Sequence, residues 1–128
     1  MMALIPNRDK PPHLAKGSAT EEQACQFLIS QGLKLIDRNF RCQSGELDLV
    51  MLDGKTLVIV EVRYRKNNRY GGAEASVTRQ KQAKIIAATQ YYLTQHKTGA
   101  SIRFDVVAMT GDNPVNWIKN AFQTECIS

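Results

Sequence analysis

Two aliphatic runs of this chain carry acidic residues at alternate positions, and this pattern constrains the fold more than any other feature. The first run covers residues 45–50 (GELDLV), and the second covers residues 58–65 (VIVEVRYR). Both runs are rich in residues that favour β-strands. Burial of an unpaired carboxylate is costly, so acids within a sheet need a partner. A divalent cation is one such partner, and an arginine network is another.

The dipeptide Asp53-Gly54 lies between the two runs and predicts a β-hairpin. If these two residues form the turn, Leu52 pairs with Lys55. One face of the hairpin then carries Glu46, Asp48, Glu61 and Arg63, and the other carries Leu47, Leu49, Met51, Val58, Val60 and Val62. In this register Asp48 and Glu61 are diagonal neighbours, with Cα atoms roughly 7–8 Å apart. A register shifted by two residues places them directly opposite, and a slip by one residue separates them.

The remaining sequence predicts a single α/β domain. Apolar periodicity and capping residues indicate a helix from Ser18 or Thr20 to Gly32, strands over 34–42, 46–52 and 56–64, a helix over 78–95, a strand over 102–109 and a short terminal helix over 116–122. Residues 1–17 hold three of the four prolines and no apolar periodicity. They predict a flexible N-terminal tail, followed by one domain over residues 18–128.

Composition restricts the setting in which the chain works. No apolar run approaches the roughly 20 residues that span a bilayer, and the apolar start of the chain is too short for a signal peptide. Cys25, Cys42 and Cys126 are odd in number and widely spaced. They predict free thiols in a reducing cytoplasm, with no disulfide framework and no zinc site.

Positive charge is concentrated in one segment. The chain has a net charge of +5, and residues 63–84 carry seven basic residues against one acid, which leaves −1 for the remainder. Such a segment predicts a phosphate-facing surface, although a solvated, solubilising surface is an equal alternative. The candidate nucleic-acid contacts are Arg65, Lys66, Arg69, Tyr70, Arg79, Lys81 and Lys84. Tyr70 offers a ring on which a base could stack, unless its loop is a plain connector.

The acidic residues of the hairpin suit a hard cation. Mg²⁺ prefers oxygen ligands and needs one or two carboxylates in addition to water and substrate phosphate. Asp48 and Glu61 can supply them, and Glu21 lies at the N-terminal end of the apolar stripe of the first helix. Glu21 either points into the same cleft or stabilises the helix dipole. The alternative to a metal site is a network in which the acids pair with Arg41, Arg63 or Arg65.

The two strand motifs resemble the PD-(D/E)xK nuclease superfamily. More narrowly, the chain is similar to the YraN-like family of bacterial proteins, which are compared with archaeal Holliday-junction resolvases. The matching positions include Gly17, Glu21, Ala24, Arg38, Asn39, Gly71, Val77, Lys81, residues 103–107 and residues 120–122. The resemblance implies a restriction-endonuclease-like core, with a mixed four-stranded sheet flanked by helices in the order αβββαβ. It also implies that Asp48 and Glu61 bind Mg²⁺ or Mn²⁺, with Glu21 in support.

One position departs from the superfamily pattern. The residue two after the glutamate is normally lysine, and here it is Arg63. Arginine stays protonated and cannot act as a general base, although it can stabilise a charged transition state. We therefore expect a metal-dependent nuclease-like protein acting on DNA, with branched, structured or single-stranded DNA as partner and Arg63 on the scissile phosphate. The alternative is a catalytically inactive nucleic-acid-binding module, and the sequence leaves both a monomer and a homodimer open.

Overall fold

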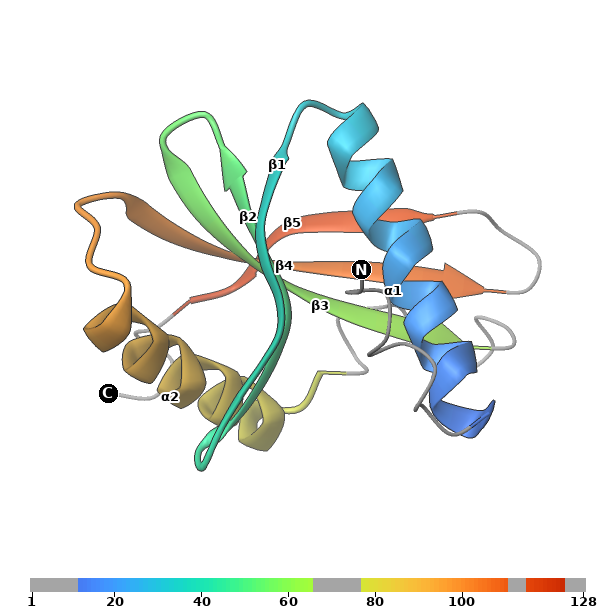
Figure 1. The fold of residues 1–128 in the computed structure, drawn as a ribbon, viewed down its shortest axis with the longest axis horizontal. Coiled ribbons are helices and arrows are strands. Elements are labelled where there is room, and N and C mark those ends of the chain that lie inside the picture. The colour runs from blue at the N-terminus through green and yellow to red at the C-terminus, as the bar shows by residue number, and fades with distance from the viewer. Residues whose placement is uncertain (1–11, 66–76, 111–114, 124–128) are drawn as a thin grey trace, which may run out of the picture.

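The computed structural model describes residues 12–65, 77–110 and 115–123, in which two helices flank one mixed β-sheet (Figure 1). The elements are α1 (Pro12–Ser30), β1 (Lys34–Cys42), β2 (Gly45–Asp53), β3 (Thr56–Arg65), α2 (Arg79–Gln95), β4 (Ser101–Thr110) and β5 (Asn116–Phe122). The strands lie in the order β1-β2-β3-β4-β5. β3 and β4 are parallel, whereas the other neighbours are antiparallel. The predicted α/β, restriction-endonuclease-like arrangement is compatible with this sheet.

The fifth strand replaces a predicted helix. Residues 116–122 form β5, which pairs with β4 through Ile118 opposite Val106 and Trp117 opposite Val107. The prediction of a terminal helix, and with it of a four-stranded sheet, was therefore wrong. A helix of this length is marginal by itself, whereas a strand gains backbone hydrogen bonds from a neighbour that local sequence does not reveal.

The first helix starts earlier than its sequence predicted. α1 begins at Pro12, ahead of the expected start at Ser18 or Thr20. Proline is favoured at the first helical position, because its missing N–H has no partner there and its φ already suits a helix. Residues 12–17 are therefore helical. Residues 1–11 lie outside the described part of the chain, so the division between tail and domain stays a prediction.

The β2–β3 turn is displaced from the predicted position. Asp53 pairs with Thr56, so the turn consists of Gly54 and Lys55, and the predicted pairing of Leu52 with Lys55 is wrong. Gly54 has a φ of +61°, which glycine adopts without the steric cost of a side chain. The pairing ends at Leu49 and Val60. Asp48 and Glu61 are the next residues on the two strands, as in the shifted register.

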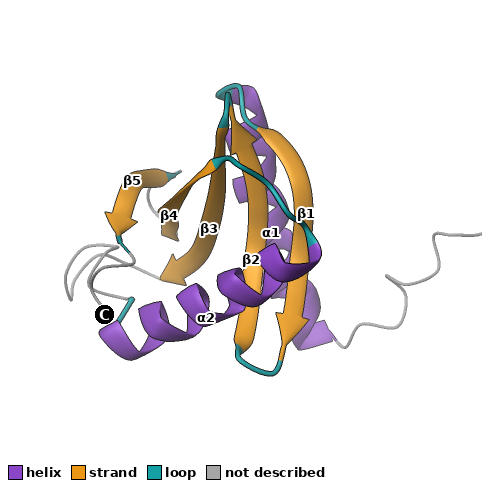
Figure 2. Cartoon of the chain, turned by 90° about the vertical axis from the view of Figure 1, so that its left-hand side faces the viewer, coloured by secondary structure: helices purple, strands orange, loops and turns teal. Residues whose placement is uncertain are grey.

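Each face of the sheet is covered by one helix (Figure 2). On one side α1 contributes Ala24, Cys25 and Leu28 to a core that contains Leu49, Met51, Val58 and Val60. On the other side α2 contributes Ile85, Ile86 and Tyr92, which pack with Val50, Leu57 and Ile59. The hairpin face that bears the acids is therefore only partly polar. Leu47, predicted on the same face as Leu49, packs in the α2 core at a point where the β2–β3 pairing has ended.

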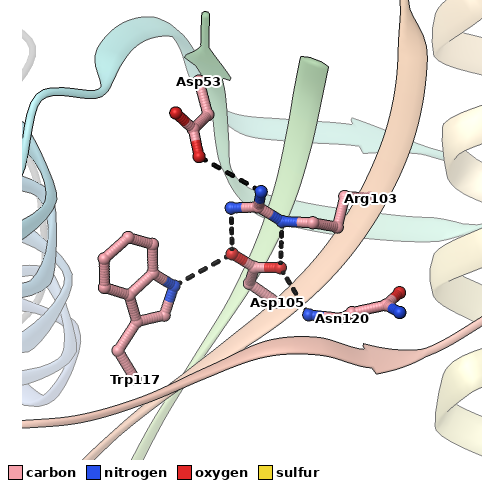
Figure 3. A network of polar contacts seen from close by, with 5 residues as sticks. All are labelled: Asp53, Arg103, Asp105, Trp117 and Asn120. Carbon is pink, nitrogen blue, oxygen red and sulfur yellow. Dashed lines mark hydrogen bonds and ion pairs between the residues drawn. The ribbon is translucent and has the colours of Figure 1, made fainter.

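A buried acid holds β5 against β4 (Figure 3). Asp105 is 0% exposed and accepts two hydrogen bonds of 2.9 Å from Arg103. Trp117 Nε1 and the backbone N–H of Asn120 donate to the same carboxylate, each at 2.9 Å. Arg103 also pairs with Asp53 at 3.1 Å. This network occurs where the β4–β5 register shifts, so it supplies polar partners where the regular ladder is interrupted.

The free thiols that the sequence predicted are confirmed for the two cysteines that the structure describes. Cys25 and Cys42 are free thiols, and Cys126 lies outside the described residues. Among the helices of the described ranges, none is long and apolar enough to cross a membrane.

Candidate active site

Asp48 and Glu61 lie side by side at the edge of the α2 core. The residues are 8% and 5% exposed, although both are acids. Asp48 accepts a hydrogen bond of 2.9 Å from the backbone N–H of Val62 through Oδ2. This amide is available because the β2–β3 pairing has stopped at Leu49 and Val60. The end of the ladder therefore gives one carboxylate a fixed position beside the other.

Burial makes the ionised forms of both acids unfavourable. Desolvation raises the pKa of Asp48, while the hydrogen bond from Val62 opposes this effect. Desolvation, followed by the negative charge of Asp48, raises the pKa of Glu61 to about 7. The two acids therefore repel each other in a site from which water is largely excluded.

Two cations approach Glu61 from different elements. Arg63 Nη1, on the same strand, is 3.5 Å from Glu61 Oε2, and Lys81 Nζ, on α2, is 3.6 Å from the same oxygen. Both side chains are just over one-third exposed. The positive charges lower the pKa of Glu61, but burial and Asp48 outweigh them. The acid pair is therefore partly neutralised by the chain itself.

The start of α2 determines where Lys81 lies. Thr78 is the N-cap, and its hydroxyl accepts a hydrogen bond of 3.1 Å from the backbone N–H of Lys81. The sequence assigned Lys81 to nucleic-acid contact and left open that it reaches the acid site from the second helix, and the structure places it beside Glu61. The available signal was its position on the helix face that carries Ile85, which is buried against the sheet.

A second ion pair lies next to the acids. Arg41 Nε is 3.1 Å from Glu46 Oε1, with both side chains about half exposed or more. The charge of Glu46 also raises the pKa of Asp48. The predicted alternative of an acid–arginine network is thus present at two acids. Arg41 pairs with Glu46, and Arg63 Nη1 lies 3.5 Å from Glu61 Oε2.

Comparison with known proteins places the chain in a family. Residues 20–109 match the uncharacterised protein family UPF0102. The chain belongs to the UPF0102 family. It is 46% identical over 123 residues to a UPF0102 protein of Herminiimonas arsenicoxydans, covering 94% of this chain and 98% of the relative. It is 49% identical over 115 residues to a UPF0102 protein of Aeromonas hydrophila, covering 88% of each chain. The resemblance to the YraN-like family is confirmed at this level.

Within this UPF0102 family member, Glu21 belongs to α1, whereas the acid pair belongs to β2 and β3. Glu21 is on α1, the helix that covers the opposite face of the sheet from α2. The hydrogen bond with Glu22 is the main cause that raises the pKa of Arg38 on β1, and the charge of Glu21 adds a smaller contribution. In the part of the chain that the structure describes, no group of three or more His, Cys, Asp or Glu residues is arranged to hold a metal. The supporting role of Glu21 therefore stays a prediction.

Two further basic residues of the predicted segment lie on α2, the helix that carries Lys81. Arg79 and Lys84 are exposed on α2, in the same half of the helix as Lys81. Arg65 ends β3, but its side chain is outside the described atoms. Lys66, Arg69 and Tyr70 lie outside the described residues altogether, so their predicted contacts with nucleic acid stay predictions.

The acid pair has the chemistry of a divalent-cation site in this family member. Mg²⁺ and Mn²⁺ favour carboxylate oxygens, and one or two carboxylates suffice when water and phosphate complete the coordination. The pKa values of both acids stay raised, mainly by burial, so Arg63 and Lys81 do not offset the full cost of ionising the pair. A bound cation would remove this penalty. The chemistry of the two side chains therefore suits the metal that the sequence predicted, and metal binding by Asp48 and Glu61 stays a prediction.

Proposed function

We propose that this protein is a metal-dependent nuclease that hydrolyses DNA phosphodiesters at Asp48 and Glu61. The observation that carries the proposal is the pair of buried neighbouring carboxylates, with raised pKa values and two cations at 3.5 and 3.6 Å. Buried acids with perturbed pKa values are characteristic of functional sites. In the reaction, a water oxygen bonds to phosphorus as a P–O bond to the sugar breaks, and the leaving oxygen takes up a proton.

Asp48 and Glu61 would hold Mg²⁺ or Mn²⁺, with Glu21 supporting from α1. When bound, such an ion polarises the phosphoryl group and lowers the pKa of the attacking water. Asp48 is held in position by the Val62 N–H, so its carboxylate needs little rearrangement to bind. Glu61 must be ionised to act as a ligand, and its cationic neighbours favour that form.

The two cations act on the phosphate. Arg63 contacts the scissile phosphate and stabilises charge that develops on its oxygens, without taking a proton. Lys81 brings a second positive charge to the same acid from α2. Together with Arg79 and Lys84, it gives the DNA backbone a basic approach to the site. Branched, flapped or single-stranded DNA is the proposed substrate class.

A cleavage assay with one active-site variant and one matched control tests the proposal. The protein is incubated with branched, flapped and linear DNA in Mg²⁺ or Mn²⁺, and with EDTA as a blank. Asp48→Asn removes a proposed ligand with almost no change of shape. Asp53→Asn is the matched control, because it makes the same substitution at the other end of β2. Metal-dependent cleavage by the wild type and the control, but not by Asp48→Asn, supports a nuclease.

A second function is favoured by Arg63, which occupies the usual position of lysine. In this alternative the protein is a nucleic-acid-binding module that retains the nuclease fold without activity. Salt-sensitive DNA binding by a wild-type protein that cleaves nothing supports the module. Absence of DNA binding at modest salt contradicts both functions.

A further inference from the structure

A pocket of about 240 Å³ lies between the β1–β2 turn and α2. It is lined by Arg41, Cys42, Gln43, Ser44 and Tyr91. The first four residues come from the end of β1 and the turn that follows, and Tyr91 comes from the second half of α2. The pocket therefore joins an aromatic side chain from one element to polar side chains from another.

Tyr91 presents a supported ring to this pocket. The residue is 46% exposed and is one of the large hydrophobic residues that the described part of the chain leaves at its surface. Its ring centroid is 6.2 Å from that of Phe40, at an interplanar angle of 32°. Gln95 Nε2 lies 3.3 Å from its hydroxyl oxygen as a hydrogen-bond donor. These contacts hold the ring while leaving nearly half of the residue open to a ligand.

The polar side of the pocket supplies hydrogen-bond groups of several kinds. The side chain of Arg41 is 71% exposed, even though its guanidinium pairs with Glu46. Gln43 and Ser44 are exposed turn residues that add an amide and a hydroxyl. An aromatic platform together with such groups is suited to an unpaired nucleobase, which stacks on the ring and offers its edge for hydrogen bonding. In a duplex, by contrast, the faces of a base are covered by stacking and its Watson–Crick edge is occupied by its partner.

The pocket is connected to the acid pair along α2. One side of α2 carries three of these residues in succession. Lys84 follows Lys81 by three residues, and Tyr91 follows Lys84 by seven. The turn is close to α2 there, because a Cβ on Gly45 would lie 3.3 Å from the carbonyl oxygen of Lys84. Lys81 and Tyr91 are about 15 Å apart along the helix axis. That distance corresponds to a few nucleotides of one DNA strand.

We propose that this pocket binds an unpaired base of the DNA a few nucleotides from the phosphate that reaches Asp48 and Glu61. The inference rests on the proposed function, and it names the substrate class more closely as DNA with a single-stranded segment. Tyr91 stacks on the base, the turn residues contact its edge or its phosphate, and Lys84 lies beneath the connecting backbone.

Fluorescence anisotropy in EDTA tests the pocket without cleavage. The probes are a fluorescein-labelled oligothymidine of about 15 nucleotides and a blunt duplex of the same length. Tyr91→Ala is expected to weaken binding of the single strand by about 5- to 100-fold, the usual effect of removing one stacking partner, and to change duplex binding little. Tyr91→Phe keeps the ring and is expected to bind like the wild type. Tyr64→Ala is the matched control, because Tyr64 is 49% exposed on β3.

A second pocket variant covers the case in which Tyr91→Ala does not fold. Gln43→Ala changes an exposed turn residue and is expected to reduce single-strand binding several-fold while leaving the unfolding midpoint unchanged. The pocket proposal is overturned if Gln43→Ala binds the single strand as the wild type does and Tyr91→Ala shows no specific loss. Tyr91→Ala shows no specific loss if it also binds like the wild type, or if Tyr64→Ala weakens binding by the same factor. If DNA cleavage that depends on Asp48 persists in that case, the nuclease proposal survives the failure. If the wild type neither binds nor cleaves DNA, both proposals fail together.

Discussion

Glu61→Gln tests the electrostatic account of the site most directly, because glutamine has almost the shape of a protonated glutamate. The pKa of Glu61 is raised from 4.5 to about 7 in the folded protein, by burial first and by the charge of Asp48 second. The folded state therefore holds this proton more tightly than the unfolded state does. Between pH 4.5 and 7 the unfolded chain loses the proton first, so the free energy of unfolding falls as pH rises.

The size of this effect follows from the shift. One pKa unit corresponds to about 1.4 kcal/mol, so the shift of Glu61 costs the folded protein at most about 3 kcal/mol at pH 8. Glutamine carries no charge at any pH and avoids this cost. We expect Glu61→Gln to be more stable than the wild type at pH 8 by up to about 3 kcal/mol. The difference should vanish near pH 4, where Glu61 is protonated.

Urea unfolding in EDTA, followed by circular dichroism at pH 4, 6 and 8, measures the difference. Glu22→Gln is a control in which we expect the opposite change in the free energy of unfolding, because a hydrogen bond from Arg38 lowers the pKa of Glu22. This control should be less stable than the wild type at pH 8 and similar to it at low pH. A Glu61→Gln variant that is less stable than the wild type at pH 8, or a difference that does not change with pH, would refute the reasoning.

Three further outcomes follow from particular contacts. Mn²⁺ should raise the melting temperature of the wild type at pH 7.5 and leave that of Asp48→Asn unchanged in calorimetry, because only the intact pair binds the ion more tightly when folded. Asp105→Asn should lower the free energy of unfolding by about 3–5 kcal/mol in urea, because it leaves Arg103 without its buried partner. Thr78→Ala should cost about 1 kcal/mol in the same assay, since it removes the cap of α2, and should lower the cleavage rate by displacing Lys81.

The order of elements was largely predictable because its signals are local. Alternating aliphatic residues defined the boundaries of β2 and β3 to within one residue, and Thr78 marked the start of α2. β5 was not predicted because the sequence pattern of a short amphipathic segment is compatible with either a helix or a strand until its neighbour is known. The predicted hairpin register was wrong because the turn begins one residue later than expected. Gly54, not Asp53, takes the first turn position, where a positive φ favours glycine.

The acid pair was predictable and its surroundings were not. Period-two alternation places Asp48 and Glu61 on one face in either hairpin register, so their proximity survived the error in the turn. Lys81 is twenty residues further along the chain than Glu61, and its contact depends on how α2 crosses the sheet. The pocket beside Tyr91 depends on the same crossing, because its lining joins α2 to the β1–β2 turn. Contacts between elements of this kind leave no periodic signal in sequence.

The position of the acids argues that function, rather than stability, explains them. Val50 and Ile59 are two residues from the acids on the same face of the two strands and are buried in the α2 core, which would accept similar side chains in place of Asp48 and Glu61. Such side chains would remove the electrostatic penalty that raises both pKa values. Arg63 and Lys81 reduce the penalty without cancelling it. A bound divalent cation would offset the penalty that remains, which is why the metal-binding and unfolding experiments bear on the same two side chains.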